Sequence, residues 1–458
     1  MTDFRKAAIQ YAHENQQRFL DDLKEFVSIP SISTEPEHKG DLQRAAEWVA
    51  TRLRALGVED VQLFPTAGYP VVYGNYMKAG PAAKTVLVYG HYDVQPVDPL
   101  ELWQSGPFDP QVRGDNLYAR GASDMKGQAM ATFAAIEAVK CNGGLPVNLK
   151  FLIEGDEEVG SPGLGEFIAS HKDLLACDLA ANPDTGMLAE DFPTITYALR
   201  GLAYFEVRIY GPSHDLHSGL FGGVVHNPAQ VLCELVAAMH DAQGRVTLPG
   251  FYDKVRSLDQ EERQELSRLP ATEAFYLEQT GAPALWGEVG YTPVERIGAR
   301  PTLEVNGLLS GFTGEGSKTV LPAWAMAKIS CRLVPDQDHQ EVYEQLKKFV
   351  EMHAPKTIRY EVLNLVGSPA SISDRRSGGV QAMVKALETV WGKRPAFRRE
   401  GGSVPVVGEF QTHLGIETVN FGFSLPGDNA HSPNEKLHLP TWYRGIDALI
   451  HFFYNLAE

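Results

Sequence analysis

Residues 85–93 read TVLVYGHYD, an apolar run typical of a buried strand that leads into His91 and Asp93. Open α/β sheets hold their ligands beyond the carboxyl ends of their strands, so a histidine and a carboxylate here are well placed for a site. Residues two apart in an extended chain point the same way, and Asp93 could therefore accept the imidazole N–H of His91 and orient the ring toward a metal ion. Taken alone, His91 fits a structural histidine better than a ligand, and its neighbour strengthens the metal interpretation.

Alternating strands and helices surround this segment. Apolar residues at helical spacing, with Gly57 where a glycine would end a helix, predict helices, and short β-rich runs predict strands. The predicted strands are 58–64, 71–77, 85–89 and 147–154, and the predicted helices are 7–27, 41–56 and 126–140. This alternation predicts an α/β fold, with a mixed, mostly parallel sheet and helices on both faces.

The pattern changes near residue 200. An alternating strand at 204–210 is followed by a helix that Asn227 and Pro228 could start, and further elements suggest an α+β arrangement. These further elements are strands at 302–309, 323–333 and 357–365 and a helix at 340–353, before a turn-rich joint at 366–369 and a final helix at 441–456. Because 458 residues exceed one hydrophobic core, we predict an inserted domain at 200–369 between two parts of another domain, 1–199 and 370–458. The pattern assigns no role to residues 251–300.

Composition and charge narrow the possible partners. A formal charge of −17 disfavours nucleic acid and anionic membrane surfaces. The four cysteines form no C-x-x-C pair, so buried thiols are expected rather than a redox centre. The polar N-terminal segment lacks the core of a signal peptide and no apolar run could span a bilayer, so we expect a cytoplasmic protein.

Four more segments place acidic or histidine side chains where a strand passes into a loop or a helix begins. They read RGASDMKG (120–127), EGDEEVG (154–160), NPDTG (182–186) and NAHSPNE (429–435). Each has an ordinary explanation, namely a helix N-cap for Asp124, a solvated acidic loop, a turn at Asp184 and a loop histidine at His431. One parallel sheet would nevertheless bring them to one edge with His91, and together they predict a metal site.

Oxygen ligands with two imidazoles suit a pair of divalent ions such as Zn²⁺ or Mn²⁺ that share one carboxylate. Cleavage of an amide bond also needs a proton carrier, which a spare carboxylate of Glu157 or Glu158 could supply. A phosphate loop in GFTGEGSKT (311–319) is rejected, because the glycine and lysine are separated and no helix follows. The sequence has neither H-E-x-x-H nor a G-x-S-x-G elbow.

These residues resemble the dinuclear metallopeptidase family that includes carnosinase, cytosolic non-specific dipeptidase, aminoacylase and a glutamate-releasing carboxypeptidase. The resemblance covers almost the whole chain. It is carried by GHYDVQP (90–96), the Asp124 segment, GDEEVGS (155–161) and AHSPNE (430–435), which occur in the family's order.

The resemblance implies roles for these residues. His91, Asp124 and Asp184 would hold one metal ion and Asp124, Glu158 and His431 the other, with Asp124 bridging the two ions. Asp93 would support His91, and Glu157 would be the general base. The Asp124–Met125 peptide bond would be cis. Met125 departs from the acidic residue that is commoner at this position in carnosinase-like chains, which leaves metal preference and substrate breadth open.

The resemblance also implies that 1–199 and 370–458 form the catalytic domain and that the inserted domain at 200–369 is a lid and dimerisation domain, which pairs two subunits. Some residues would act from this lid. His217, in DLHSGLFGG (215–223), would stabilise the oxyanion in the active site of a partner subunit, although a surface histidine is the simpler interpretation of this residue alone. The free carboxylate of the substrate would be bound by Thr319, Arg332, Gly402 and Ser403. Arginine suits this task because its rigid fork can take a carboxylate through two parallel hydrogen bonds.

We therefore predict a homodimeric dipeptidase that uses two divalent ions and a water activated by a glutamate. Two alternatives stay open, an N-acyl-amino-acid deacylase and a carboxypeptidase, since both would share every metal ligand. A metal-free dimeric binding protein is disfavoured because no ligand and no base is missing from the motifs.

Overall fold

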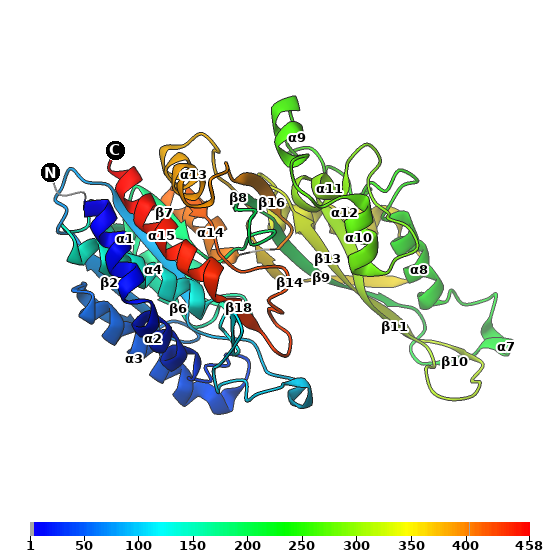
Figure 1. Cartoon of the computed structure of the whole chain (residues 1–458). Helices are drawn as coiled ribbons and strands as arrows, with labels where there is room; N and C mark the ends of the chain where they lie inside the picture. Colours follow the sequence, from blue (N-terminus) through cyan, green and yellow to red (C-terminus); the bar gives the residue numbers. More distant parts are fainter. Residues whose placement is uncertain (1–3, 403) are drawn as a thin grey trace. The chain divides into compact units, whose positions relative to one another are not determined.

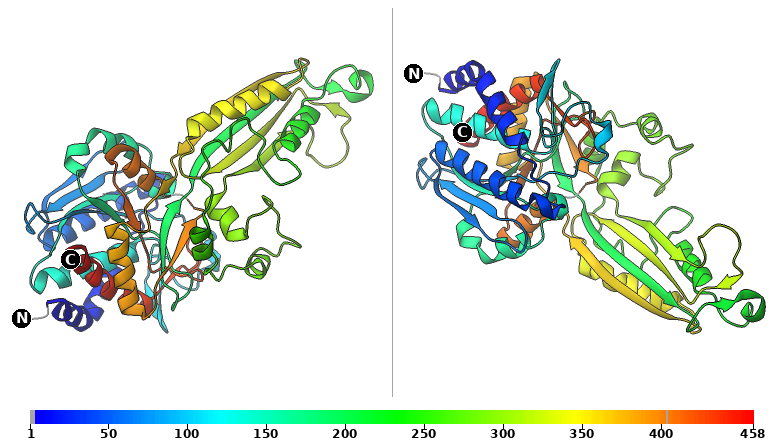
Figure 2. Two further views of the ribbon diagram at one scale, coloured as in Figure 1. Left: turned by 90° about the horizontal axis from the view of Figure 1, so that it is seen from above. Right: turned by 90° about the horizontal axis from the view of Figure 1, so that it is seen from below.

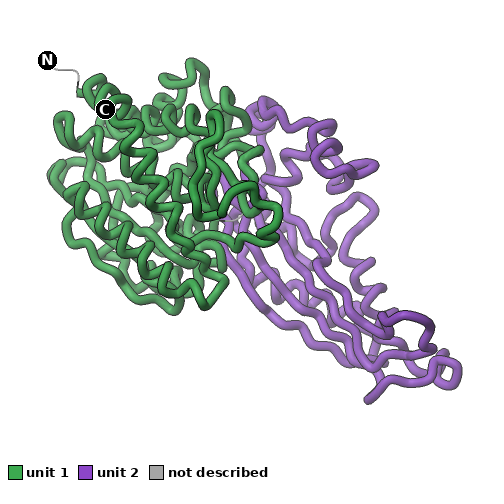
Figure 3. The backbone as a smooth tube through the Cα atoms, turned by 60° about the horizontal axis from the view of Figure 1, so that its bottom comes forward, with its two compact units in different colours: residues 1–197, 373–398, 404–458 green, residues 198–372, 399–403 purple. Residues whose placement is uncertain are grey.

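The computed structural model describes residues 4–402 and 404–458 (Figure 1). The chain forms two compact units (Figure 3). Unit 1 consists of residues 1–197, 373–398 and 404–458, and unit 2 of residues 198–372 and 399–403. Unit 2 therefore interrupts unit 1 in the sequence, and it also takes in a short segment, 399–403, that the sequence pattern does not separate from its surroundings.

Unit 1 is built on a mixed sheet with the strand order β1-β2-β6-β3-β7-β17-β8. These strands are β1 (Glu59–Phe64), β2 (Val71–Tyr76), β3 (Thr85–His91), β6 (Asn148–Glu154), β7 (Leu179–Asn182), β17 (Thr418–Asn420) and β8 (Thr194–Leu199). The central strands β6, β3, β7 and β17 are parallel, whereas β1, β2 and β8 pair antiparallel. The central strands are buried on both faces, which explains their continuous apolar runs.

Helices cover both faces of this sheet (Figure 2). One face carries α1 (Phe4–Glu14), α2 (Gln16–Val27), α3 (Lys39–Ala55), α4 (Lys126–Cys141), α13 (Gly378–Trp391) and α15 (Leu439–Leu456). The other carries α5 (Leu164–Ser170) and α14 (Pro405–Glu409), and α6 (Lys172–Leu175) follows α5. Helix α4 is buried around most of its circumference, because it packs against α1, α2 and α15 as well as β3. The predicted α/β class is thus confirmed.

A small three-stranded sheet in unit 1 adjoins the loops that carry Asp124 and His431. Its strands are β4 (Gln111–Arg113), β5 (Asn116–Tyr118) and β18 (Lys436–His438). Strand β18 pairs antiparallel with β5, so the loop before residue 436 lies beside the loop after residue 118. The sequence pattern does not predict this sheet, because strands of three residues are too short to show a period.

Unit 2 contains a four-stranded antiparallel sheet with the order β11-β13-β9-β14. Its strands are β9 (Gly201–Tyr210), β11 (Thr302–Ser310), β13 (Trp324–Leu333) and β14 (Arg359–Ser368). Alternate residues of β9, from Ala203 to Ile209, point into a core that α8 (Pro228–Ala238) and α12 (His339–His353) cover. Asn227 caps α8 ahead of Pro228, as predicted.

The remaining elements of unit 2 are short. They are β10 (Leu216–His217), α7 (Ser218–Phe221), α9 (Gln260–Leu266), α10 (Glu273–Thr280), α11 (Pro293–Ala299), β12 (Val320–Leu321) and β15 (Ser371–Ile372). Strand β16 (Ala396–Glu400) runs from unit 1 into segment 399–403. Three of these helices lie in residues 251–300, which the sequence left unassigned.

The predicted helix at 7–27 is wrong in one respect, because it is two helices that meet at Asn15. The side-chain amide of Asn15 donates to the carbonyl of Tyr11 at 2.9 Å, and an asparagine that competes for backbone groups in this way favours a helix end. None of the described helices has the length and hydropathy needed to cross a membrane.

Candidate metal centre

The predicted edge of the unit 1 sheet brings six side chains into one cluster. His91 is the last residue of β3 and pairs in register with Glu154, the last residue of β6. Asn182 of β7 likewise pairs with Asn420 of β17. The end of β3, the loops that leave the other parallel strands and the turn before α4 supply the six side chains. They are His91, Asp124, Glu157, Glu158, Asp184 and His431.

Asp124 lies between the two histidines of this cluster. One carboxylate oxygen, Oδ1, is 3.3 Å from Nε2 of His91, and the other, Oδ2, is 2.9 Å from Nε2 of His431. Its carboxylate does not cap α4, since Met125 occupies the N-cap position without a side-chain hydrogen bond. The Asp124–Met125 peptide bond is cis, as predicted. A carboxylate that turns one oxygen toward each of two imidazoles is arranged to bridge two cations.

Each histidine has a second acidic neighbour on its own side of Asp124. Oδ2 of Asp184 is 3.9 Å from Nε2 of His91, and Oε2 of Glu158 is 3.3 Å from Nε2 of His431. Potential ligand atoms of His91, Asp124 and Glu158 all lie within 4.8 Å of one another, and so do those of His91, Glu157 and Asp184. His91 belongs to both of these groups, and His431 is joined to the cluster by its contacts with Asp124 and Glu158.

The chemistry of the cluster fits divalent cations. Nε2 of His91 is buried, and its 3.3 Å approach to Asp124 lacks the geometry of a hydrogen bond, so no hydrogen bond within the described part of the chain satisfies it. Such a buried nitrogen is costly unless something binds it. Burial raises the pKa of Asp184 to about 7, and burial together with the neighbouring acids raises the pKa of Glu157 well above its ordinary value. Cations would relieve this crowding of acidic groups.

Asp93 contacts both His91 and the backbone of Glu157 and Glu158. Nδ1 of His91 is hydrogen-bonded to the backbone carbonyl of Asp93 at 3.1 Å and lies 3.4 Å from its carboxylate. The backbone N–H groups of Glu157 and Glu158 donate to that carboxylate at 3.3 and 3.1 Å. The ring is thus oriented mainly by the backbone of Asp93, while the carboxylate fixes the short helix η3 (Glu157–Val159).

Glu435, to which the sequence pattern assigns no role, shapes the loop that carries Asp124. Its fully buried carboxylate accepts hydrogen bonds from Arg120 at 2.8 Å and from the backbone N–H groups of Gly121, Ser123 and Asp124 at 2.9 to 3.0 Å. Gly121 has φ +82°, and a Cβ there would lie 2.7 Å from Val94. The only sequence signal for this role is that an acidic residue ends the His431 motif, NAHSPNE.

Gln95 is a second residue that the sequence analysis did not single out. Its side-chain amide donates to Oε2 of Glu158 at 2.8 Å and to the Glu158 backbone carbonyl at 3.3 Å. It thereby orients the carboxylate that faces His431. Its position two residues after Asp93, within GHYDVQP, was the only sequence signal.

His431 comes from a loop held in an uncommon conformation. Its φ is +61°, which is rare for a residue other than glycine and is typical of functional sites. Asp428 anchors the loop, since its carboxylate accepts hydrogen bonds from the Leu425 backbone, Ser123 and Lys436. Hydrogen bonds to Asp124 and Glu158 raise the pKa of His431 to about 10.

Unit 2 brings two of the other predicted residues together. Strand β10 pairs with β12, and the Ser218 N–H donates to the carbonyl of Thr319 at 3.0 Å, so His217 and Thr319 lie on adjacent segments. His217 is exposed, and its Nδ1 accepts a hydrogen bond from the Gly219 N–H at 3.0 Å. In the neutral ring the proton is therefore on Nε2, which can donate.

Arg332 lies on β13, and Gly402 follows β16. A further arginine, Arg200, links their surroundings, because its Nε donates to the carbonyl of Gly401 at 3.1 Å and the charge of Arg332 acts on it. Sequence analysis did not single out Arg200. Ser403, also predicted to bind substrate, lies outside the described residues.

Comparison with known proteins identifies the family. A family model for peptidase family M20/M25/M40 matches residues 87–455. The chain belongs to this peptidase family, as the motifs predicted.

Relatives match over almost their whole length. The chain is 31% identical to Cys-Gly metallodipeptidase DUG1 of Candida albicans, over 96% of this chain and 95% of that protein. It is 30% identical to Beta-Ala-His dipeptidase of Homo sapiens, over 98% and 92%. Among solved structures, the M20 family metallo-carboxypeptidase Sso-CP2 from Sulfolobus solfataricus has a TM-score of 0.85 and 34% identity, covering 96% of this chain and 99% of that one. Human carnosine dipeptidase 1 has a TM-score of 0.78 and 30% identity, covering 99% and 98%.

Proposed function

We propose that this chain is a metal-dependent dipeptidase that hydrolyses the peptide bond of small dipeptides with a free C-terminal carboxylate. The observation that carries the proposal is the position of Asp124, whose two oxygens face His91 and His431. Relatives named as dipeptidases, each matching more than nine-tenths of this chain, support the reaction class.

The ligand sets are those that the family resemblance implies, and the acid beside each histidine, Asp184 for His91 and Glu158 for His431, supports them. His91, Asp124 and Asp184 would hold one ion, and Asp124, Glu158 and His431 the other. When bound, a pair of divalent ions lowers the pKa of water and polarises a carbonyl group. Zn²⁺ and Mn²⁺ are the ions we propose, because both accept imidazole and carboxylate ligands.

Glu157 is the residue we assign to proton transfer. Its buried carboxyl group has a raised pKa, so it can take a proton from the attacking water and pass it to the leaving amine. Geometry alone also groups Glu157 with His91 and Asp184 as a possible ligand, and the family resemblance favours the role of base. Asp93 holds the Glu157 backbone and thereby keeps the carboxyl group in place.

The remaining roles belong to residues of unit 2. His217 would donate from Nε2 to the scissile carbonyl oxygen in the active site of a partner subunit, which requires a homodimer formed through this unit. Thr319, Arg332, Gly402 and Ser403 would bind the substrate's free carboxylate. Location in the cytoplasm stays a prediction.

A dipeptide-library assay tests the proposed function. The metal-depleted enzyme, supplied separately with Zn²⁺ and Mn²⁺, should release both amino acids from dipeptides and should act slowly on dipeptides whose C-terminus is amidated. Similarity to a metallo-carboxypeptidase makes that activity the second candidate. Faster removal of the C-terminal residue from tripeptides than hydrolysis of any dipeptide would favour the carboxypeptidase.

A further inference from the structure

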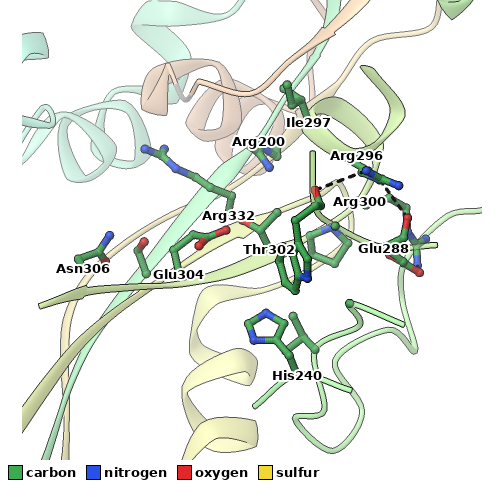
Figure 4. A pocket seen from close by; sticks show the side chains of 16 residues that line it. Arg200, His240, Glu288, Arg296, Ile297, Arg300, Thr302, Glu304, Asn306 and Arg332 are labelled. Carbon is green, nitrogen blue, oxygen red and sulfur yellow. Dashed lines mark hydrogen bonds and ion pairs between the residues drawn. The ribbon is translucent and has the colours of Figure 1, made fainter. Parts of the chain in front are cut away.

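Unit 2 contains a cavity of about 460 Å³ (Figure 4). Sheet residues such as Thr302 and Ser330 line one part of it, and residues from 240–300 line the other. Four arginines, Arg200, Arg296, Arg300 and Arg332, contribute to its wall. Two carboxylates, Glu288 and Glu304, also line the cavity, so four guanidinium groups face two acids. A wall with this excess of positive charge is suited to an anionic ligand.

Two of these arginines are engaged in holding the cavity wall together. Arg300 forms a bidentate pair with Glu288, at 2.7 and 2.8 Å. Arg296 donates to the backbone carbonyls of Glu288 and Trp286, at 3.0 and 3.4 Å. These hydrogen bonds give both arginines a structural role in the cavity wall.

Arg200 is in a different situation. Its Nε donates to the Gly401 carbonyl at 3.1 Å. Arg200 directly precedes strand β9, in which Leu202 pairs with Arg332 of β13. Burial and the charge of Arg332 lower the pKa of Arg200 to about 10, and the opposing charges of Glu304 and Glu400 do not compensate. Two positive groups are thus held near each other in a partly buried place, which an anion would stabilise.

Arg200 lies beside the two segments that carry the residues proposed to bind the substrate's carboxylate. One is β13, which carries Arg332, and the other is the segment of Gly401 and Gly402. A guanidinium fixed at Nε by a backbone carbonyl is pre-oriented, so less conformational entropy is lost when its terminal nitrogens bind a carboxylate.

We propose that Arg200 is a specificity-determining residue of the carboxylate subsite, where its guanidinium binds the C-terminal carboxylate of a dipeptide together with Arg332. This inference rests on the proposed function and adds a residue to it. Arg200 selects acids over amides, because the neutral amide lacks the charge that both arginines stabilise.

The test is Arg200→Gln, assayed with the Ala-Ala dipeptide and with its C-terminal amide. Glutamine can still donate to the Gly401 carbonyl, so the variant removes the charge while keeping that hydrogen bond. We expect the KM for the dipeptide to rise about tenfold with kcat nearly unchanged, and the KM for the amide to stay the same. Arg296→Gln, in the same cavity wall, should change neither KM.

Two results would overturn the inference. One is an equal rise in KM for dipeptide and amide, which would make Arg200 only a structural support, and the other is no change in either KM. If melting curves show that Arg200→Gln is unfolded, Arg200→Lys is the deciding variant. Lysine keeps the positive charge, so this variant should keep part of the preference for acid over amide. An equal loss of activity on both substrates would refute the role. Failure of the wild-type enzyme to cleave any dipeptide would overturn the proposed function as well, whereas normal wild-type cleavage with an unchanged ratio in the variant overturns this inference alone.

Discussion

Glu157 and Glu158 are consecutive residues whose side chains have different surroundings. Glu158 is 3.3 Å from His431 and receives a hydrogen bond from Gln95, as a metal ligand would. Burial raises the pKa of Glu157 well above its ordinary value, which suits a group that carries a proton during the reaction. The two carboxylates should therefore respond differently to the same substitution.

Glu157→Gln should leave two ions bound and lower kcat by about 10²–10⁴-fold, because it removes the proton carrier and spares the proposed ligands. Metal analysis and steady-state kinetics on the same preparation test this. Glu158→Gln is the matched comparison and should instead lose metal. Near-normal turnover in Glu157→Gln would show that another group is the base.

Sequence could predict the side chains that gather in the cluster, and Asp93 beside His91, but not the more distant residues that position them. His91, Asp124 and His431 stand in motifs at strand ends, where residue type and spacing are informative. Glu435 and Gln95 act through hydrogen bonds to the backbone and to a carboxylate far away in sequence. Only the folded chain reveals such partners.

The loop at 120–124 depends on Glu435 as a structural element. The buried Arg120–Glu435 pair is 2.8 Å apart, with both side chains about 1% exposed. Glu435→Gln should lower the free energy of unfolding by about 3 kcal/mol, because it leaves the Arg120 charge without its buried partner. Urea unfolding measures the change.

Glu101→Gln, at an exposed glutamate of unit 1, is the control and should change stability by less than about 0.5 kcal/mol. A Glu435→Gln variant as stable as this control would show that the carboxylate does not hold the loop.

Helices and strands whose apolar residues follow a clear period could be predicted from the sequence. Very short elements, and those that depend on contacts between distant residues, could not. Strand β3 and helices α4 and α12 match the expected segments to within a few residues, since each shows a buried run or a helical spacing. The break at Asn15 and the three-stranded sheet depend on single hydrogen bonds and on pairing between distant residues. Helices α9 to α11 are only seven or eight residues long, too short for a distinct pattern.

The proposed mechanism requires two chains, because one subunit would supply His217 to the active site of the other. His217 is exposed, and its ring is oriented by the Gly219 N–H so that Nε2 can donate. If it stabilises the oxyanion of a partner subunit, mixing the two strongly impaired variants His217→Ala and Glu157→Gln should restore activity. A heterodimer then contains one site with both groups intact, and the lost oxyanion contact is worth about 10²–10³-fold in kcat.

Subunit exchange must be confirmed in that mixture, for example with differently tagged chains. A mixture that exchanges subunits and stays as inactive as its parents would show that His217 does not act across subunits. Size-exclusion chromatography with light scattering should find the dimer in the active wild-type preparation.

The central claim is that two divalent ions, sharing Asp124, make this chain a dipeptidase. Metal titration of the chelator-treated enzyme tests it most directly, with bound ions per subunit and dipeptide hydrolysis measured on each sample. The account predicts no activity without metal and a plateau of activity at two bound ions per subunit, with Zn²⁺ or Mn²⁺. Full activity in the metal-free protein, or with a single bound ion per subunit, would contradict it.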